Sequence, residues 1–371
     1  MDIDKKDEMR RTYIWGTGKI AQYIYHFYHD ELKNYNIVGC IDNDKRKEGQ
    51  FFEAAGVYIF LPDILLKDKQ CQIIILAAAC HEIEQQITTQ YPWITGRIDN
   101  YLLFTKQRLR NRYQKTQDEE LKDILCYLKE QPLQVFNYNF ATKYNSMNFD
   151  ILYDEQAGLF YVLFEHKRMY FARHLDSKEK VSDYYRQIAM EQDLESPHRY
   201  LFGEFQVDSN SVVIDAGVAE GNFALSVIDR VKKIYLFEAD PEWIEALKYT
   251  FAPYSDKVII VNKYLSNYTD ASTISIDSYM PEEQIDFMKL DIEGEEYYAL
   301  DGARNTIAAS MHMKCAVCTY HKEFDYNILS QLLDELGFEV THSRGYMWFP
   351  YDRNSIFDLP TLRRGLIRAK K

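Results

Sequence analysis

Residues 211–226 read SVVIDAGVAEGNFALS, and this stretch decides how the second half of the chain folds. Its apolar run predicts a buried strand, the glycines after Asp215 predict a turn, and NFALS begins a helical pattern. Because the strands are continuously apolar rather than alternating, they indicate a parallel sheet covered by helices on both faces. The expected strands are residues 211–217, 233–240, 257–266, 285–294 and 313–321, and the expected helices are residues 222–231, 241–251 and 300–309.

The first part of the chain has a shorter series of the same kind, beginning with TYIWGTGKIA at residue 12. The predicted fold class is therefore α/β, with two Rossmann-like doubly wound domains. Helical spacing and antiparallel strand patterns lie between them and predict a connector with helices and a β-hairpin. The expected domains are residues 12–105, a connector over 106–196, a second doubly wound domain over 197–350 and a basic, solvated tail over 351–371.

Charge and composition narrow the function classes. The chain of 371 residues has 44 Lys and Arg against 57 Asp and Glu, a formal charge of −13, which argues against a nucleic-acid partner. A hydrophobic content of 46% is typical of a folded domain with a core. The start has no apolar signal-peptide core and no long apolar run follows, so we expect a cytoplasmic protein without a transmembrane segment.

The six cysteines are scattered, mostly in apolar runs, as expected for buried thiols in a reducing compartment. Cys315 and Cys318 form a CxxC pair, but they lie in an expected strand, where residues three apart face opposite sides. A second ligand pair at zinc spacing does not follow. The sequence therefore predicts no metal site.

Acidic residues and glycines end the strands of the second domain, where doubly wound sheets bind their ligands. Asp215 is followed by Gly217 and Gly221, and Glu238 ends the next strand. An acid at this interval from the glycine turn is typical of a group that accepts hydrogen bonds from a ribose diol. Asp291 ends a later strand in KLDIEGEE.

The glycine turn differs from a dinucleotide-binding GxGxxG because it reads GVAEG, with an acid at Glu220. A carboxylate there repels a diphosphate but tolerates a ligand with amino and sulfonium cations. This difference favours S-adenosyl-L-methionine over NAD as the cofactor.

The three stretches VVIDAGVAEGNFALS, IYLFEADPEWIEAL and IDFMKLDIEGEEYYALDGA together resemble the FkbM family of S-adenosylmethionine-dependent methyltransferases. CTYHKEFD and LGFEVTHSRGY are similar to the usual ending of that family, and the resemblance spans residues 197–346. The chain departs from the common motif DVGANxG at Val218, Ala219 and Glu220, which bears on the cofactor contacts of that turn.

The resemblance implies an O-methyltransferase acting on a hydroxyl, often of a sugar or polysaccharide precursor. Carried over by position, Asp215, Gly217 and Gly221 line the methionine side of the cofactor. Glu238 holds the ribose, Asp240 lies near the adenosine, and Asp291 lies beside the transferred methyl group. Loss of cofactor binding is then expected for Asp215→Ala and for Glu238→Ala. The full predicted cofactor-binding set is Asp215, Gly217, Glu220, Gly221, Asn222, Glu238, Ala239 and Asp240.

Methyl transfer is an in-line displacement, so alignment supplies most of the rate enhancement and one base near the acceptor hydroxyl suffices. The candidate catalytic residues are Asp291, Glu293 and His321, all at neighbouring strand ends. His198 precedes the first strand of the domain and is expected to pack rather than to close over the site.

The amino-terminal domain leaves several functions open. Gly16 and Gly18 begin a GxGxxA turn and Asp42 ends the next strand, which resembles the nucleotide-sugar-binding domains of some sugar-modifying enzymes. The domain could instead be a scaffold or a dimer contact, so a homo-oligomer stays open. Two alternatives to a methyltransferase remain: a nucleotide-sugar or NAD-dependent oxidoreductase or epimerase centred on this domain, and a non-catalytic cofactor-binding protein. The expected substrate partner is a small molecule or glycan acceptor.

Overall fold

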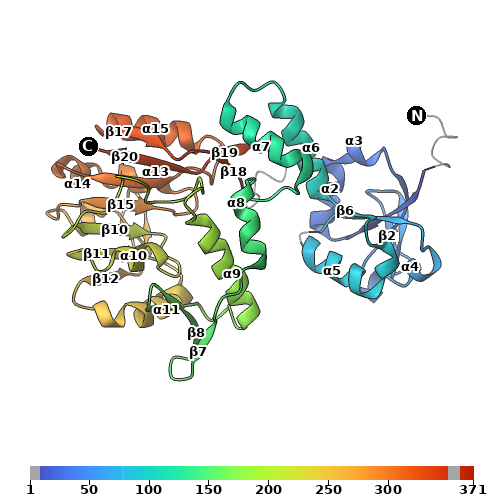
Figure 1. Ribbon diagram of the computed structural model, residues 1–371, viewed down its shortest axis with the longest axis horizontal. Helices are drawn as coiled ribbons and strands as arrows, with labels where there is room; N and C mark the ends of the chain where they lie inside the picture. Colours follow the sequence, from blue (N-terminus) through green and yellow to red (C-terminus); the bar gives the residue numbers. More distant parts are fainter. Residues whose placement is uncertain (1–8, 78, 350–359) are drawn as a thin grey trace. The chain divides into compact units, whose positions relative to one another are not determined.

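The computed structural model describes residues 9–77, 79–349 and 360–371, and its helices and strands are labelled in Figure 1. The chain divides into two compact units. The described residues of the amino-terminal unit are 9–77, 79–116, 125–134 and 360, and those of the carboxyl-terminal unit are 117–124, 135–349 and 361–371.

The amino-terminal unit has a sheet of six described strands in the order β3-β4-β2-β1-β5-β6, parallel except for β3. Tyr13 and Trp15 of β1 pack into one core cluster and Ile14 packs into another, so both faces of the sheet are buried as expected. The strands are β1 Arg11–Trp15, β2 Asn36–Ile41, β3 Phe51–Phe52, β4 Val57–Phe60, β5 Gln72–Ile75 and β6 Ile98–Asn100. The helices are α2 Lys19–Phe27, α3 His29–Leu32, α4 Ile64–Lys67, α5 Cys80–Gln90 and α6 Tyr101–Tyr113, with η1 Lys45–Lys47 and η2 Pro92–Ile94, and α7 Glu119–Glu130 follows.

The carboxyl-terminal unit is built on a sheet of seven described strands in the order β12-β11-β10-β15-β16-β20-β17. In this sheet β12, β11, β10, β15 and β16 are parallel to one another. Strand β20 is antiparallel to both of its neighbours, β16 and β17. Val213 of β10 packs into one core cluster and Ile214 into the other, so helices cover both faces. The sheet strands are β10 Val212–Ala216, β11 Lys233–Phe237, β12 Val258–Val261, β15 Phe287–Leu290, β16 Lys314–Cys318, β17 Glu339–His342 and β20 Leu366–Lys370.

Helices α8 to α15 and three small sheets complete this unit. The helices are α8 Asn139–Thr142, α9 Lys178–Glu191, α10 Asn222–Val227, α11 Pro241–Phe251, α12 Ile276–Tyr279, α13 Glu296–Asp301, α14 Arg304–Ala309 and α15 Asp325–Glu335, with η3 Lys143–Ser146 and η4 Ala252–Tyr254. Two of the small sheets are strand pairs, β13 Tyr264–Leu265 with β14 Thr273–Ile274, and β18 Tyr346–Trp348 with β19 Leu362–Arg364. No helix among the described residues combines the length and apolar character that a membrane span requires.

The region expected to be a connector, 106–196, is divided between the two units. Its β-hairpin pattern forms an antiparallel sheet of β7 Leu152–Asp154, β8 Leu159–Phe164 and β9 Lys167–Tyr170. This sheet packs on the carboxyl-terminal unit, where the backbone N–H of Tyr170 donates to Thr250 Oγ1 at 3.0 Å. The hairpin is therefore an integral part of the second unit rather than a linker.

The prediction of a basic, solvated tail over 351–371 is wrong for its described part, residues 360–371. Strand β20 is inserted between β16 and β17, and Ile367 and Ala369 are fully buried. Basic side chains that suggested a tail have partners within the unit: the Arg368 guanidinium donates to the carbonyl oxygen of Arg199, and Lys370 pairs with Glu339. Residues 350–359 of the predicted tail lie outside the described residues.

The buried position of β20 leads to a stability prediction. Ile367→Val removes one methylene from a fully buried side chain, so we expect a loss of about 1 kcal/mol in the free energy of unfolding. Urea denaturation measures it. The matched control is Ile328→Val on α15, where the side chain is 48% exposed and we expect almost no change. Equal effects of the two substitutions would contradict the insertion of β20 into the sheet.

Candidate active site

A cavity of about 740 Å³ lies at the carboxyl ends of the parallel strands of the carboxyl-terminal unit. Its walls come from the turn after β10, the ends of β11, β15 and β16, and the helix α9, which precedes the sheet in the chain. Of the predicted cofactor-binding residues, those that border the cavity are Gly217, Glu220, Asn222, Glu238, Ala239 and Asp240. Of the predicted catalytic residues, Asp291 and Glu293 border it.

The cavity is strongly acidic. Among the described residues, seven acidic and two basic side chains line it, and one of the bases, Lys289, is already paired with a buried acid. Such a wall attracts a cation and repels a diphosphate. The acids are Glu191, Glu220, Glu238, Asp240, Asp291, Glu293 and Glu295.

The glycine turn after β10 is shaped by its protein neighbours. Gly217 has φ +69°, and a Cβ there would lie 1.7 Å from the carbonyl oxygen of Asp291. Gly221 has φ +85° and lies against Phe251 of α11, so a Cβ would meet that ring at 2.8 Å, and Gly221 does not border the cavity. Ala219 takes φ 45°, a left-handed conformation that suits the asparagine of the common motif better than alanine. These glycines are therefore needed for packing, beyond the approach to a ligand that the sequence predicted.

Glu238 holds the turn and the start of α11 in place. Its Oε2 accepts a hydrogen bond from the N–H of Ala219 at 3.0 Å, and its Oε1 accepts from the N–H groups of Ala239 at 2.7 Å and Asp240 at 2.9 Å. A carboxylate has about four lone-pair sites, so these contacts leave room for about one further donor from the cavity. The predicted ribose acid thus also organises the protein around it.

Asp215 lies behind the cavity wall. Its side chain is fully buried, does not border the cavity and lies 3.1 Å from Lys289 Nζ. Lys289 also donates to the carbonyl oxygens of Ala216 and Gly217 at 3.2 and 2.5 Å. Burial raises the pKa of Asp215, although the Lys289 charge opposes the shift. Sequence reasoning missed Lys289, whose signal was a lysine inside the apolar strand FMKL.

Four side chains surround the Asp291 carboxylate. Its Oδ2 accepts from the Tyr200 hydroxyl at 2.7 Å and its Oδ1 accepts from the Tyr320 hydroxyl at 3.0 Å. His198 and His321 each place Nε2 at 3.4 Å from one of the two oxygens. Burial by itself would raise the pKa of Asp291, but His198, Lys289 and His321 hold it well below its ordinary value. An acid so stabilised as its anion is a weak proton acceptor.

His321 is held between carboxylates. The ring is buried, with Nδ1 at 3.1 Å from Glu296 Oε1 and Nε2 facing Asp291 and, at 3.9 Å, Glu293. Burial would lower the pKa of His321, but Glu296, Asp291 and Glu293 raise it to about 9. The ring is therefore an imidazolium near neutral pH, which disfavours the general-base role predicted from the sequence.

Two other carboxylates fit a base better. Glu293 borders the cavity on the strand-end loop, with 87% of its side chain exposed. Glu191, the last residue of α9, also borders the cavity, and burial raises its pKa. Sequence reasoning missed Glu191 because α9 lies outside the strand-and-helix series, and only the tertiary fold brings it to the strand ends.

Burial brings the pKa of Glu220, one of the cavity acids, into the physiological range. It is 5% exposed, it accepts a hydrogen bond from the Tyr184 hydroxyl at 3.0 Å, and burial raises its pKa to about 7. Because this pKa is raised in the folded state, the protonated acid stabilises the fold at low pH. That contribution is lost as the pH rises from the ordinary value of 4.5 through about 7.

The titration of Glu220 gives a pH prediction. Affinity for a cationic ligand in this cavity should rise, by up to about tenfold, from about pH 6 to about pH 8 as Glu220 ionises. Calorimetric titration with S-adenosylmethionine measures it. Glu220→Gln should flatten this rise and should make the protein more stable than wild type above about pH 7. A wild-type affinity that falls over this interval would contradict the role of Glu220.

The predicted nucleotide residues of the amino-terminal unit form a separate cluster. Gly16 has φ +116° and Gly18 is the N-cap of α2. The Asp42 carboxylate accepts hydrogen bonds from the Thr17 hydroxyl and, at 2.7 Å, from Lys47 Nζ. Burial alone would raise the pKa of Asp42, but these contacts hold it below its usual range. Asp42 is thus already paired within its own unit.

Comparisons of the sequence with protein families produce two matches. Residues 255–346 match the family described as Methyltransferase FkbM domain, and residues 8–91 match the family described as C2185-like, N-terminal. The chain therefore carries an FkbM methyltransferase domain and is an enzyme of the methyltransferase class. No curated protein matches the chain.

Solved structures similar to the chain include several methyltransferases. The structure of methyltransferase FkbM from Methylobacillus flagellatus KT has 15% identity, covers 99% of this chain and 92% of that chain, and has a TM-score of 0.42. A TehB-like SAM-dependent methyltransferase from Corynebacterium glutamicum has 13% identity, covers 52% and 96%, and has a TM-score of 0.32. A protein of Streptococcus mutans described as a candidate methyltransferase, in complex with SAH, has 15% identity, covers 51% and 97%, and has a TM-score of 0.31.

Proposed function

We propose that the carboxyl-terminal unit transfers a methyl group from S-adenosylmethionine to a hydroxyl of a carbohydrate or polysaccharide precursor. The observation that carries the donor is the acidic cavity at the strand ends, which suits a ligand bearing amino and sulfonium cations. When bound, S-adenosylmethionine supplies an electrophilic methyl group.

The residues of the cavity fit this donor. Glu238 borders the cavity, and its three accepted hydrogen bonds leave it about one lone pair with which it can accept from a ribose hydroxyl. Glu220 supplies negative charge at the turn after β10, beside the backbone of Gly217. Asp215 acts indirectly in this proposal: it positions Lys289 and the turn but does not touch the donor.

Methyl transfer requires mainly that the methyl donor and the acceptor hydroxyl are aligned, together with one group that accepts the hydroxyl proton. Effective molarities of well-aligned groups are worth roughly 7 to 11 kcal/mol, and the walls that hold donor and acceptor together supply this term. A sugar hydroxyl must lose a proton as it reacts, and Glu191 and Glu293 are the carboxylates placed to accept it. Asp291 is held as a stable anion, with hydrogen bonds from the Tyr200 and Tyr320 hydroxyls. In this proposal Asp291 orients those two hydroxyl groups and does not accept the proton.

The rim of the cavity supports a sugar acceptor. Tyr264 and Tyr268 border the cavity and are 64% and 55% exposed, so they offer apolar ring faces to a ligand. Glu293 and Glu295 border the same cavity and can accept hydrogen bonds from sugar hydroxyls.

Labelled methyl transfer tests the proposed acceptor. The full chain is incubated with methyl-labelled S-adenosylmethionine and, separately, with nucleotide sugars, glycans, peptides and RNA, and the products are identified by mass spectrometry. We expect label in a sugar fraction, bound through oxygen. Label only in peptide or RNA would overturn the carbohydrate acceptor, and binding of the donor without any product would favour a non-catalytic binding protein.

A further inference from the structure

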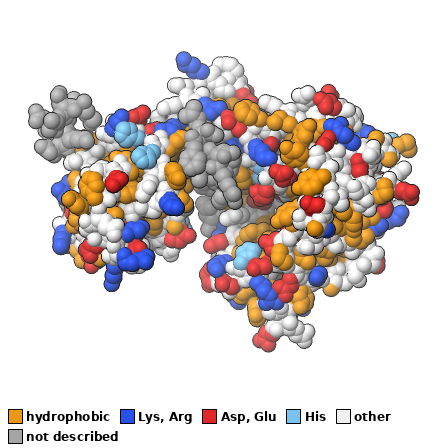
Figure 2. All heavy atoms as spheres, turned by 180° about the vertical axis from the view of Figure 1, so that it is seen from behind, with side chains coloured by type: hydrophobic (Ala, Val, Ile, Leu, Met, Phe, Trp, Pro, Cys, Tyr) orange, Lys and Arg blue, Asp and Glu red, His pale blue; other side chains and the backbone are white. Residues whose placement is uncertain are grey.

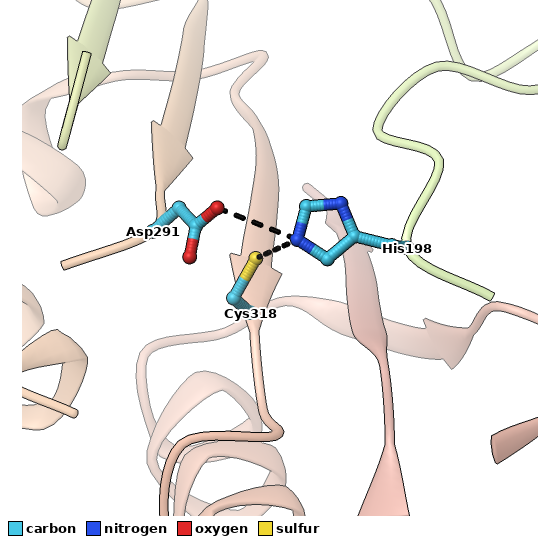
Figure 3. A group of neighbouring side chains, drawn as sticks. All are labelled: His198, Asp291 and Cys318. Carbon is cyan, nitrogen blue, oxygen red and sulfur yellow. Dashed lines mark hydrogen bonds and ion pairs between the residues drawn. The ribbon is translucent and has the colours of Figure 1, made fainter. Parts of the chain in front are cut away.

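Three side chains of metal-binding type converge beside the cavity. His198 comes from the segment between α9 and β10, Asp291 directly follows β15, and Cys318 is the last residue of β16. Figure 3 shows their functional groups pointing toward one another. His198 and Cys318 are almost completely buried, and Asp291 is the member that borders the cavity.

The distances match those of a tetrahedral metal site. Cys318 Sγ lies 3.7 Å from His198 Nε2, and His198 Nε2 lies 3.4 Å from Asp291 Oδ2. A tetrahedral zinc ion at its usual bond lengths separates sulfur from nitrogen by about 3.6 Å and nitrogen from oxygen by about 3.4 Å. The ligand atoms of the three residues all lie within 4.8 Å of one another, so one ion can contact all three.

We propose that His198 Nε2, Asp291 Oδ2 and Cys318 Sγ bind a divalent transition metal ion of the zinc class. One thiolate and one imidazole favour such an ion over magnesium or calcium, which prefer oxygen ligands. A phenol oxygen can complete the coordination, because the Tyr320 hydroxyl lies 3.3 Å from His198 Nε2 and the Tyr200 hydroxyl lies 2.7 Å from Asp291 Oδ2.

The charges balance when the ion is bound. Binding breaks the S–H bond of Cys318 and releases one proton to solvent, so thiolate and Asp291 carboxylate together offset the two charges of the ion. The two nearby cations are each paired with a carboxylate: Lys289 with Asp215 and His321 with Glu296, both at 3.1 Å. The buried site therefore carries no uncompensated charge.

A second group of residues with metal-ligand side chains consists of Asp291, Glu296 and His321. In our proposal this group supports the metal site and does not bind an ion of its own. The His321 ring lies between the two acids, with Nε2 toward Asp291 and Nδ1 toward Glu296, so one ion cannot use both sides of the ring. Through Oδ1, His321 instead orients the Asp291 carboxylate, as outer partners of metal ligands do.

The ion would join three separate segments at the edge of the cavity. It would tie the chain before β10 to the ends of β15 and β16 and would hold Asp291 in one orientation. This inference does not depend on the identity of the methyl donor or acceptor.

Cobalt substitution of the full chain tests the site without an activity assay. The purified protein is stripped with chelator, reloaded with Co²⁺ or Zn²⁺, and examined for metal content and for a cobalt–thiolate charge-transfer band. We expect stoichiometric metal and the band in wild type. Cys318→Ser should lose the band, whereas Cys315→Ser should keep it, because Cys315 lies in the other core cluster on the opposite face of β16.

A second variant guards against a folding defect in β16. His198→Asn leaves the strand unchanged and should lower the zinc affinity by at least about tenfold. Zinc should also raise the melting temperature of wild type and of Cys315→Ser, but not that of Cys318→Ser. Wild type without the cobalt–thiolate band, or with metal content equal to that of Cys318→Ser and His198→Asn, would overturn the proposal.

Discussion

Lys289→Met should destabilise the protein by about 3–5 kcal/mol, because it leaves a buried carboxylate without its partner. Asp215 and Lys289 have side chains only 1% and 4% exposed and lie 3.1 Å apart. The substitution also removes the donor to the carbonyl oxygens of Ala216 and Gly217 at the turn. Urea denaturation monitored by circular dichroism measures the loss in the free energy of unfolding.

A double substitution separates the ion pair from simple loss of packing. Asp215→Leu with Lys289→Met replaces both charges by apolar groups and should be much less destabilising than Lys289→Met alone. The matched control is Lys233→Met, which breaks a partly exposed pair with Glu283 and should cost less than about 1 kcal/mol. If Lys289→Met lowered the free energy of unfolding no more than Lys233→Met does, the buried ion pair would not stabilise the fold as we predict.

Glu238→Ala should lower the affinity for S-adenosylmethionine by about a hundredfold. The carboxylate accepts hydrogen bonds from the N–H groups of Ala219, Ala239 and Asp240, and we propose that it accepts one more from the ribose. Hydrogen bonds to a charged group contribute about 1.5–3 kcal/mol each, and a hundredfold corresponds to about 2.8 kcal/mol. Isothermal titration calorimetry measures the change.

Glu242→Gln is the matched control for Glu238→Ala. Glu242 is also an acid near the start of α11, but its carboxylate pairs with His174 at the surface and does not border the cavity. We expect its affinity for S-adenosylmethionine to equal that of wild type. Wild-type affinity in Glu238→Ala, with the fold intact by circular dichroism, would remove the proposed ribose contact and weaken the proposed donor.

On the face drawn in Figure 2, acidic and basic side chains are interspersed over the described part of the carboxyl-terminal unit.

Several features could be predicted because their causes are local in the chain. The apolar run over 212–217 predicts a strand, and Val212–Ala216 is indeed β10. The opposite directions of Cys315 and Cys318 follow from the period of a strand, and the two thiols lie in different core clusters. The position of Glu238 at a strand end follows from the same patterns.

Other features were missed because distant segments create them. The conspicuous Arg and Lys residues of β20 suggest a solvated tail, although its apolar residues enter the sheet beside β16. The sequence predicts that Asp215 touches a ligand, but Lys289, a residue 74 positions away on the neighbouring strand, pairs with it behind the wall. It also predicts that His321 is a base, but Glu296 and Asp291 raise the pKa of the ring to about 9, which disfavours that role.

The amino-acid order alone was enough to establish the alternating strands and helices, the glycine turn and the acids that end the strands, since apolar periodicity and backbone preference act over a few residues. Which of those acids faces the cavity, which is neutralised, and which meets His198 and Cys318 depended on the folded chain. Burial and charge pairing depend on the three-dimensional arrangement of the chain. They bring together residues that are distant in sequence, such as His198 and Cys318, whose Nε2 and Sγ atoms lie 3.7 Å apart.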